Sequence, residues 1–125
     1  YYASRGLGDV YKRQTYITPL ENQLKQLHLE ISNSLEQKHS IARCAKQLNI
    51  SESYFQLIYK KLFGISFQQD LILMRVTRAR FNLSTSNLSL SQIAEFCGYN
   101  NEVHFYRQFK KLTGVTPAQY RKHPF

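Results

Sequence analysis

The 125-residue sequence contains no hydrophobic run near the roughly 18 residues of a membrane span, and no signal-peptide pattern at its start. It has only two cysteines, Cys44 and Cys97, and both lie in apolar stretches with helical periodicity. We expect both to be small buried side chains of a protein in a reducing cytosol, rather than members of a disulfide or a metal site. An apolar content of 42% is enough for one domain, or two very small ones, to bury a core.

Motifs that carry enzyme chemistry are also missing. There is no phosphate-binding loop, no nucleophile elbow and no HExxH motif. The four histidines do not have metal-ligand spacing with either cysteine, and we expect His104 to be partly packed beside a turn. The sequence therefore predicts a protein that is not an enzyme, with no catalytic residue, no metal and no cofactor.

Acidic residues are scarce, with 8 Asp and Glu against 17 Lys and Arg, for a net charge of +9. Residues 40–125 hold 12 basic and 4 acidic side chains, a net of +8, whereas residues 1–39 hold 5 and 4, a net of +1. Such a field attracts a polyanion, most often nucleic acid, although a membrane surface would also respond to it. The basic excess therefore lies in residues 40–125.

The first fourteen residues, YYASRGLGDVYKRQ, show neither helical nor strand periodicity. They resemble translated sequencing-adapter DNA, and an ordinary disordered terminus is the alternative. We therefore interpret residues 1–16 as a non-native or disordered leader and expect the folded part to span residues 17–125. If the adapter interpretation is right, the natural protein continues further upstream.

From Pro19 onward the pattern becomes helical. Five apolar residues fall on one helix face at steps of four and three: Leu20, Leu24, Leu27, Ile31 and Leu35. We expect this face to pack against the domain that follows, and a free coiled coil is the alternative, which Ser34 disfavours by interrupting the seam.

The segments KKLFGIS at residues 60–66 and KKLTGVT at residues 110–116 belong to a repeat of about fifty residues. The first copy, at about 40–65, reads as a helix capped by Ser40, a turn at Asn49 and Ile50, and a second helix ended by Gly64. The core side of the second helix is predicted to carry four residues: Phe55, Ile58, Tyr59 and Leu62.

The second copy, at about 89–114, has the same plan with one residue added in the turn. Ser89 and Gln92 have capping-box spacing, and Gly98 with Tyr99 forms the turn. The core side of its second helix is predicted to carry Phe105, Phe109 and Leu112, and Gly114 ends it.

Both copies are followed by a further helix. Ser66 with Gln69 and Thr116 with Gln119 are again capping-box spacings. The first exit predicts a long helix over about 67–83, and the second a short one over about 117–122. The fold is therefore predicted to be all-α, with about seven helices in two helix-turn-helix subdomains joined by a long linker helix.

The outward face of the second helix is similar in the two copies. In the first it carries Ser53, Gln56, Leu57, Lys60 and Lys61, and in the second Val103, Tyr106, Arg107, Lys110 and Lys111. Base-contacting groups near the N-terminal end and a lysine pair near the C-terminal end are what a DNA recognition helix needs. For the lysines, the alternative to DNA contact is an ordinary solvated helix face. For Leu57 and Val103, the alternative is partial burial in the protein.

The chemistry of these side chains fits DNA. Arg107 can bind guanine O6 and N7 together, and Gln56 can bind adenine N6 and N7. Leu57, Val103 and Tyr106 can pack on thymine methyl groups, and the four lysines can bind phosphates.

The repeat and the helices around it resemble the DNA-binding domain of the AraC/XylS family of bacterial transcription regulators. The strongest match is IAEFCGYNNEVHFYRQFKKLTGVTPAQYR at residues 93–121, and the resemblance covers about 31–121. It implies seven helices, with base contacts at Ser53, Gln56, Leu57, Val103, Tyr106 and Arg107. The predicted phosphate contacts are Ser40, Ser51, Lys60, Lys61, Ser89, Asn100, Lys110 and Lys111.

The sequence departs from the family pattern at several positions. Asp70 stands where an aromatic residue is usual, and Leu57 replaces a residue that is often polar or basic. Ile72 and Leu73 are expected to face outward on the linker helix. The resemblance implies a structural role for Arg75, and we expect Arg78 and Arg80 to bridge helices or contact phosphates.

We therefore expect sequence-specific binding of double-stranded DNA by a bacterial transcription regulator, an activator that works in the cytoplasm with RNA polymerase. A monomer would place its two recognition helices in successive major grooves. Members of the family commonly carry an upstream sensor or dimerisation domain, and we expect none within these 125 residues. The alternative is a basic helical module that binds protein or RNA, and no membrane contact is expected.

Overall fold

The computed structural model describes residues 19–124, and it contains seven α-helices and no strand within that range. The predicted leader over residues 1–16 lies outside the described residues. The predicted all-α fold of two helix-turn-helix subdomains joined by a linker helix is confirmed. The helices are α2 (Pro19–Ser32), α3 (Ile41–Gln47), α4 (Glu52–Phe63), α5 (Phe67–Thr85), α6 (Leu90–Phe96), α7 (Glu102–Thr113) and α8 (Pro117–Lys122).

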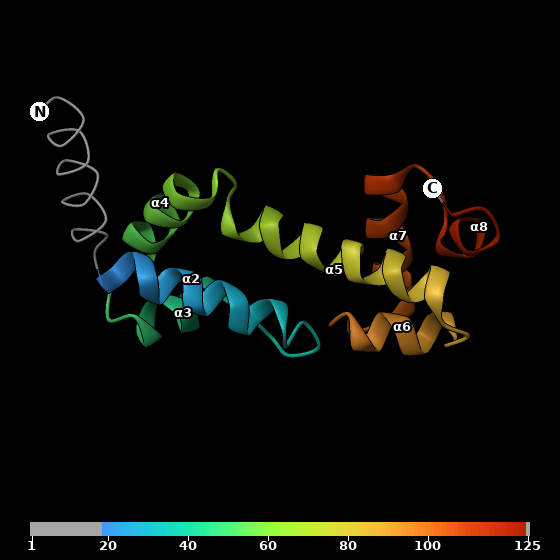
Figure 1. Cartoon of the computed structure of the whole chain (residues 1–125), viewed down its shortest axis with the longest axis horizontal. Coiled ribbons are helices and arrows are strands. Elements are labelled where there is room, and N and C mark those ends of the chain that lie inside the picture. Colours follow the sequence, from blue (N-terminus) through green and yellow to red (C-terminus); the bar gives the residue numbers. More distant parts are fainter. Residues whose placement is uncertain (1–18, 125) are drawn as a thin grey trace, which may run out of the picture.

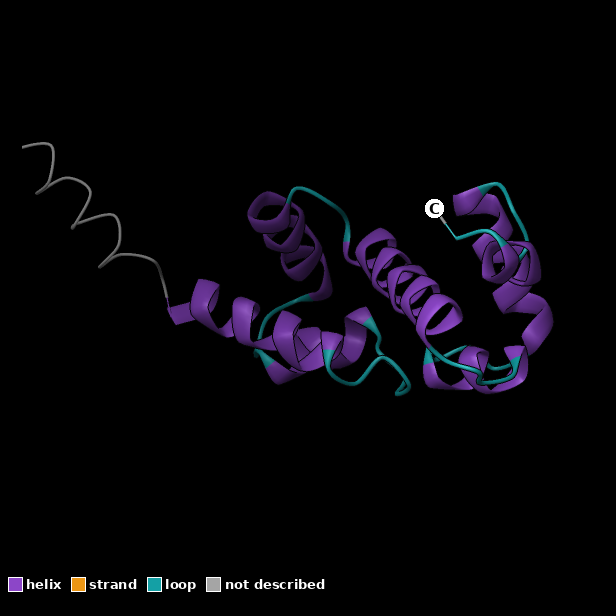
Figure 2. Cartoon of the chain, turned by 45° about the vertical axis from the view of Figure 1, so that its right-hand side comes forward, coloured by secondary structure: helices purple, strands orange, loops and turns teal. Residues whose placement is uncertain are grey.

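The helices form two groups at opposite ends of α5 (Figure 1). One group holds α2, α3, α4 and the start of α5, and the other holds the end of α5 with α6, α7 and α8. Figure 2 shows α5 running between the two groups, with helices and loops on either side. No helix in the described range is long and apolar enough to pass through a bilayer.

Each group has its own hydrophobic core. In the first, α2 contributes Leu24, Leu27 and Ile31, and the loop after it contributes Leu35, so the prediction that this face packs against the domain is confirmed. Phe55 and Tyr59 of α4 are completely buried and meet the ring of Phe67 edge-on, with centroids 5.4 Å apart in both pairs. Cys44 is buried in the same core, as expected.

The second core repeats this arrangement around α7. Phe105 and Phe109 are completely buried, and Phe109 meets the ring of Tyr120 edge-on at 5.6 Å. Cys97 is also completely buried, again as expected, and Ile93 lies in the same cluster. Burial of several large aromatic side chains therefore contributes to the stability of each half.

The predicted ends of the helices are confirmed in most positions. Gly64 and Gly114 end α4 and α7 in the left-handed conformation. Full capping boxes occur at Ser89 and at Thr116. At Ser66 the hydroxyl accepts the backbone N–H of Gln69 at 3.2 Å, but only this half of the box is present.

The exposure predicted for three apolar side chains is wrong for Leu112 and Ile72 and confirmed for Leu73. Leu112 was predicted on the core side of α7 and is 50% exposed, whereas its counterpart Leu62 is partly buried against the first core. Leu62 shares a cavity lining with Leu20 and Leu24 of α2, and within residues 19–124 the second half has no helix in the place of α2. Ile72 was expected to face outward but packs partly against the second core, while Leu73 is 50% exposed as expected.

Asp70 has a polar partner in place of an aromatic contact. Its carboxylate is buried and accepts a hydrogen bond from the Tyr59 hydroxyl at 2.5 Å, and the His28 ring lies 3.2 Å away. At the equivalent places in the second half stand Phe109 and Tyr120. In the first half the tyrosine is on α4, as Tyr59, and in the second half it is on α8, as Tyr120. Because the Tyr59 hydroxyl donates to the Asp70 carboxylate, a buried carboxylate is tolerated at position 70.

Candidate nucleic-acid interface

The outward face of α4 is open to solvent along its whole length. Ser53, Gln56, Leu57, Lys60 and Lys61 are all exposed, and Leu57 has 65% of its surface accessible. The face is held outward because Phe55 and Tyr59, on the opposite side of the same helix, are completely buried. Partial burial, the alternative for Leu57, is therefore wrong.

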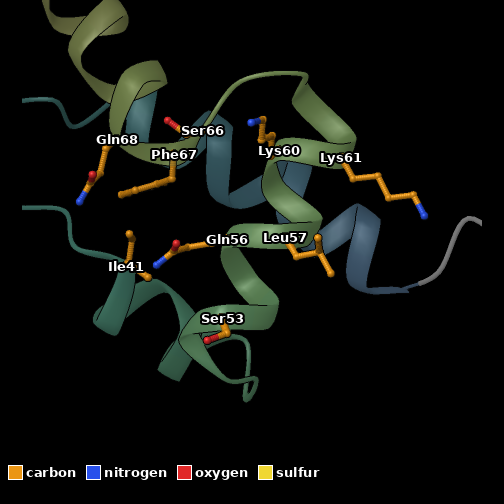
Figure 3. A pocket seen from close by; sticks show the side chains of 9 residues that line it. All are labelled: Ile41, Ser53, Gln56, Leu57, Lys60, Lys61, Ser66, Phe67 and Gln68. Carbon is orange, nitrogen blue, oxygen red and sulfur yellow. The ribbon is translucent and has the colours of Figure 1, made fainter.

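A groove of about 650 Å³ runs along this face. Figure 3 shows Gln56 extending toward Ile41 and toward Phe67 at the start of α5, while Lys61 extends away on the other side of α4. The groove has both apolar and polar walls, so it can accept apolar and hydrogen-bonding edges together. Its lining is Ile41, Ser53, Gln56, Leu57, Lys60, Lys61, Ser66, Phe67 and Gln68.

The outward face of α7 is exposed in the same way. Val103 is 59% and Tyr106 43% accessible, and Arg107, Lys110 and Lys111 are also exposed. The burial of Phe105 and Phe109 sets this orientation, as Phe55 and Tyr59 do in α4. Partial burial of Val103 is therefore wrong too.

The lysines at the ends of these helices are available for anions. Lys60 and Lys61 lie in the last turn of α4, and Lys110 and Lys111 lie in the last turn of α7. None of the four forms a salt bridge within residues 19–124. Exposed cations without a carboxylate partner keep their full charge for a polyanion.

The three predicted phosphate-binding serines all cap helices. Ser40, Ser51 and Ser89 accept the backbone N–H of the residue three positions later, each at 3.1 Å, and all three are exposed. Each helix N-terminus adds the positive end of its dipole, which favours a nearby anion.

The fourth predicted polar residue, Asn100, is exposed but does not cap α7. Asn101 is the cap, and its side-chain oxygen accepts the His104 N–H at 2.7 Å. Sequence reasoning missed Asn101, although an offset of 50, which relates Phe55 to Phe105, would have paired it with Ser51. His104 itself is exposed, with its ring edge-on to Tyr99 at 5.3 Å.

The arginines of α5 bind protein atoms. The Arg75 guanidinium donates to the carbonyls of Leu35 and Gln37 at 3.4 and 3.2 Å. Arg78 donates to the Ser32 carbonyl at 3.2 Å. Arg80 donates to the Tyr120 hydroxyl at 3.4 Å and lies 5.6 Å from the centre of that ring. All three therefore bridge helices or loops within the molecule.

Comparison with known proteins agrees with this geometry. A family profile described as a helix-turn-helix domain matches residues 44–123. The raffinose operon transcriptional regulatory protein RafR of Pediococcus pentosaceus is 39% identical over 75 residues, which cover 60% of this chain and 27% of RafR. The arabinose operon regulatory protein of Escherichia coli K12 is 27% identical over 104 residues, which cover 82% of this chain and 36% of that protein.

A solved structure also matches. The DNA-binding domain of AdpA, described as a global transcriptional factor and solved in complex with a target DNA, has a TM-score of 0.76 and 27% identity. The match covers 79% of this chain and 89% of that domain. The chain spans between 12% and 37% of the length of the first curated relatives that it matches. It belongs to the AraC/XylS family of transcription regulators, and residues 44–123 form the helix-turn-helix domain of that family.

Proposed function

We propose that this domain binds a specific sequence of double-stranded DNA, with α4 and α7 in two successive major grooves. The observation that carries the proposal is the repeated exposed face, in which three exposed side chains proposed to contact bases precede a lysine pair without a salt bridge in the described residues on both helices. The linker helix α5 has 19 residues, which corresponds to a length of about 28 Å. This length is close to the roughly 34 Å repeat of B-DNA along one side of the duplex.

Base recognition in the proposal differs between the two faces. On α4, Gln56 would bind adenine, and Leu57 would pack against a thymine methyl group beside Ser53. On α7, Arg107 would bind guanine through two hydrogen bonds, with Val103 and Tyr106 against neighbouring bases. The exposure of all six side chains supports these roles.

Affinity without sequence preference would come from the backbone of the duplex. Lys60, Lys61, Lys110 and Lys111 would bind phosphates, and Ser40, Ser51, Ser89 and Asn100 would lie against the same strands near helix N-termini. Asn101 joins this set as the counterpart of Ser51.

The regulatory role is part of the same proposal. Relatives of this chain are named as operon regulators and, in Salmonella, as the transcriptional activator RhaR. We infer that this protein activates transcription in the cytoplasm through RNA polymerase. The small share of each relative that the chain covers supports a further domain, for sensing or dimerisation, in the whole protein.

The experiment begins with selection of bound sites from random double-stranded oligonucleotides. A selected duplex should then bind at least about 10³-fold more tightly than random duplex. Log affinity should fall linearly with log salt concentration, because bound lysines release counterions from the duplex. Equal competition by random duplex would contradict specific binding, and preferential binding of RNA would favour a basic RNA-binding module instead.

A further inference from the structure

The two halves of the molecule meet beside α5 at a small junction. The loop after α2, at residues 33–40, reaches the turn between α6 and α7, as Figure 1 shows. A cavity of about 380 Å³ lies between them, and Glu36 and Lys38 of the first half share its lining with Glu95 and Tyr99 of the second. Each half otherwise packs on its own core, so this junction and α5 carry the relative placement of the two halves.

Gly98 stands at the centre of the junction. Its φ of 90° lies in the left-handed region, where a side chain is strained. A Cβ at this position would overlap the Leu35 carbonyl oxygen and would lie 2.9 Å from Nε of Arg75. Gly114 has a similar φ of 82°, but a Cβ added there would have nothing within 4 Å. The two glycines therefore share the left-handed backbone conformation, but only Gly98 lies against the other half of the molecule.

Arg75 closes the junction from the linker helix. One terminal nitrogen donates to the Leu35 and Gln37 carbonyls of the loop, and Nε is buried without a hydrogen-bond partner in residues 19–124. Burial lowers the pKa of the guanidinium from its ordinary value, while the neighbouring Tyr99 and Cys97 act in the opposite direction. Arg75 is partly buried, and its guanidinium ties α5 to the loop after α2 while it lies next to Gly98 of the α6–α7 turn, so the loop, α5 and this turn meet at one residue.

We infer that Gly98 and Arg75 are positioning residues that set the spacing and rotation of α7 relative to α4, and thereby the distance between the two half-sites that the domain accepts on DNA. This inference rests on the proposed function. α5 limits how far apart the halves can lie, but a single helix with separate cores at its ends can still bend and twist, which changes both the spacing and the rotation of α7 relative to α4. Contact between the loop after α2 and the α6–α7 turn restricts this bending and twisting. Neither residue contacts DNA in this scheme.

The test compares Gly98→Ala with Gly114→Ala, which adds the same methyl group at a similar φ without touching the other half. Binding is measured on selected duplexes in which the distance between the half-sites is changed by one base pair in either direction. Gly98→Ala should weaken binding at the original spacing by about tenfold or more, because the second half no longer binds as part of the same rigid unit. It should also shift or flatten the spacing preference, and Gly114→Ala should leave that preference as it is.

Arg75→Lys is the second variant, because it keeps the charge but has a shorter side chain without the planar guanidinium whose Nη2 reaches both carbonyls. It should flatten the spacing preference with an unchanged salt slope. If both Gly98→Ala and Arg75→Lys fold and retain the original spacing preference, the inference is wrong. The same holds if Gly114→Ala changes the preference as much as Gly98→Ala does.

A measurement without DNA separates this inference from the proposed function. The distance between two spin labels is measured, with one label on Gln47→Cys of α3 and the other on Ser91→Cys of α6. Both positions are exposed and can be labelled, whereas the native Cys44 and Cys97 are buried. The distance distribution of the labels should be single and narrow in the parent protein and broader or displaced in Gly98→Ala. An unchanged distribution would overturn the inference. Failure of the parent protein to bind any duplex would overturn the proposed function and the half-site part of the inference, whereas the positioning of α7 relative to α4 by Gly98 would still be decided by the distance distribution.

Discussion

Single residues distinguish the two proposed DNA-reading faces. Leu57 on α4 has an apolar side chain, and its counterpart on α7 is Arg107, which presents a planar set of donors. An apolar contact with a thymine methyl group discriminates less strongly between bases than two hydrogen bonds to one guanine. The proposal therefore assigns sharper discrimination to the second face, which has the arginine.

Arg107→Ala should relax the preference at one base pair of the selected site by about 1–3 kcal/mol, because only direct readout of that base is lost. Titration of the selected duplex and of duplexes with each substitution at that position measures this. The control is Lys110→Ala, which should weaken all sequences alike and lower the salt slope by about one unit. Equal losses on selected and random DNA for Arg107→Ala would contradict direct readout.

Tyr59 and Asp70 illustrate a residue-scale effect inside the core. The Tyr59 hydroxyl donates to a carboxylate that is only 8% exposed. Burial, followed by the hydrogen bond to Asp70, raises the pKa of Tyr59 well above its ordinary value, so this phenol stays protonated and remains a donor.

Tyr59→Phe should lower the free energy of unfolding by about 1–3 kcal/mol, because the Asp70 carboxylate then loses a buried hydrogen bond. Urea unfolding followed by circular dichroism measures this. Tyr54→Phe is the matched control, since Tyr54 is on the same helix and is exposed, and it should change stability by less than about 0.5 kcal/mol. Similar losses in the two variants would show that the hydrogen bond contributes nothing.

At the scale of the helix, capping decides where the proposed DNA-reading faces begin. Ser51 and Asn101 both accept the N–H three residues later, and each starts the helix just before its first outward-facing residue, Ser53 or Val103. A frayed first turn would displace these side chains, because they lie within it.

Asn101→Ala should lower the free energy of unfolding by about 1 kcal/mol, through loss of the cap of α7. Its neighbour Asn100 is also exposed but does not cap the helix, so Asn100→Ala should leave stability within about 0.5 kcal/mol and affect only DNA affinity. Thermal unfolding and DNA titration of the two variants separate these effects. Equal destabilisation by both substitutions would contradict the assignment of the cap.

At the scale of the whole molecule, buried thiol and phenol groups near the junction link folding to pH. Burial raises the pKa of Cys97 from 9.0 to about 11 and that of Tyr99 from 10.0 to about 12. Both groups are neutral when protonated, so above pH 9 the unfolded chain releases protons that the folded state retains. Stability from these two groups is therefore complete below pH 9 and falls as the pH rises toward 12.

Cys97→Ala should reduce the steepness of this alkaline loss between pH 9 and 11 by about 1.4 kcal/mol per pH unit, the value for one proton. Urea unfolding at several pH values measures the slope, which is independent of any constant loss from the smaller side chain. If the variant and the parent have the same slope in this range, Cys97 does not link folding to pH.

Local patterns in the sequence predicted the helices, most of their caps and the outward faces. These features depend on the 3.6-residue period and on neighbours within a few positions, as with the apolar stripe of α4 and the glycine after it. The burial of Cys44 and Cys97 followed from the same patterns.

Other features depended on which elements lie side by side. The exposure of Leu112, the partial burial of Ile72 and the partner of Asp70 could not be predicted, because each is set by packing between elements rather than by the local pattern. The sequence by itself determined two amphipathic units and their chemistry, since helical periodicity is local. Only the tertiary structure decided how the units are fixed to each other, because the contact of Gly98 with Leu35 and Arg75 joins segments that share no pattern along the chain.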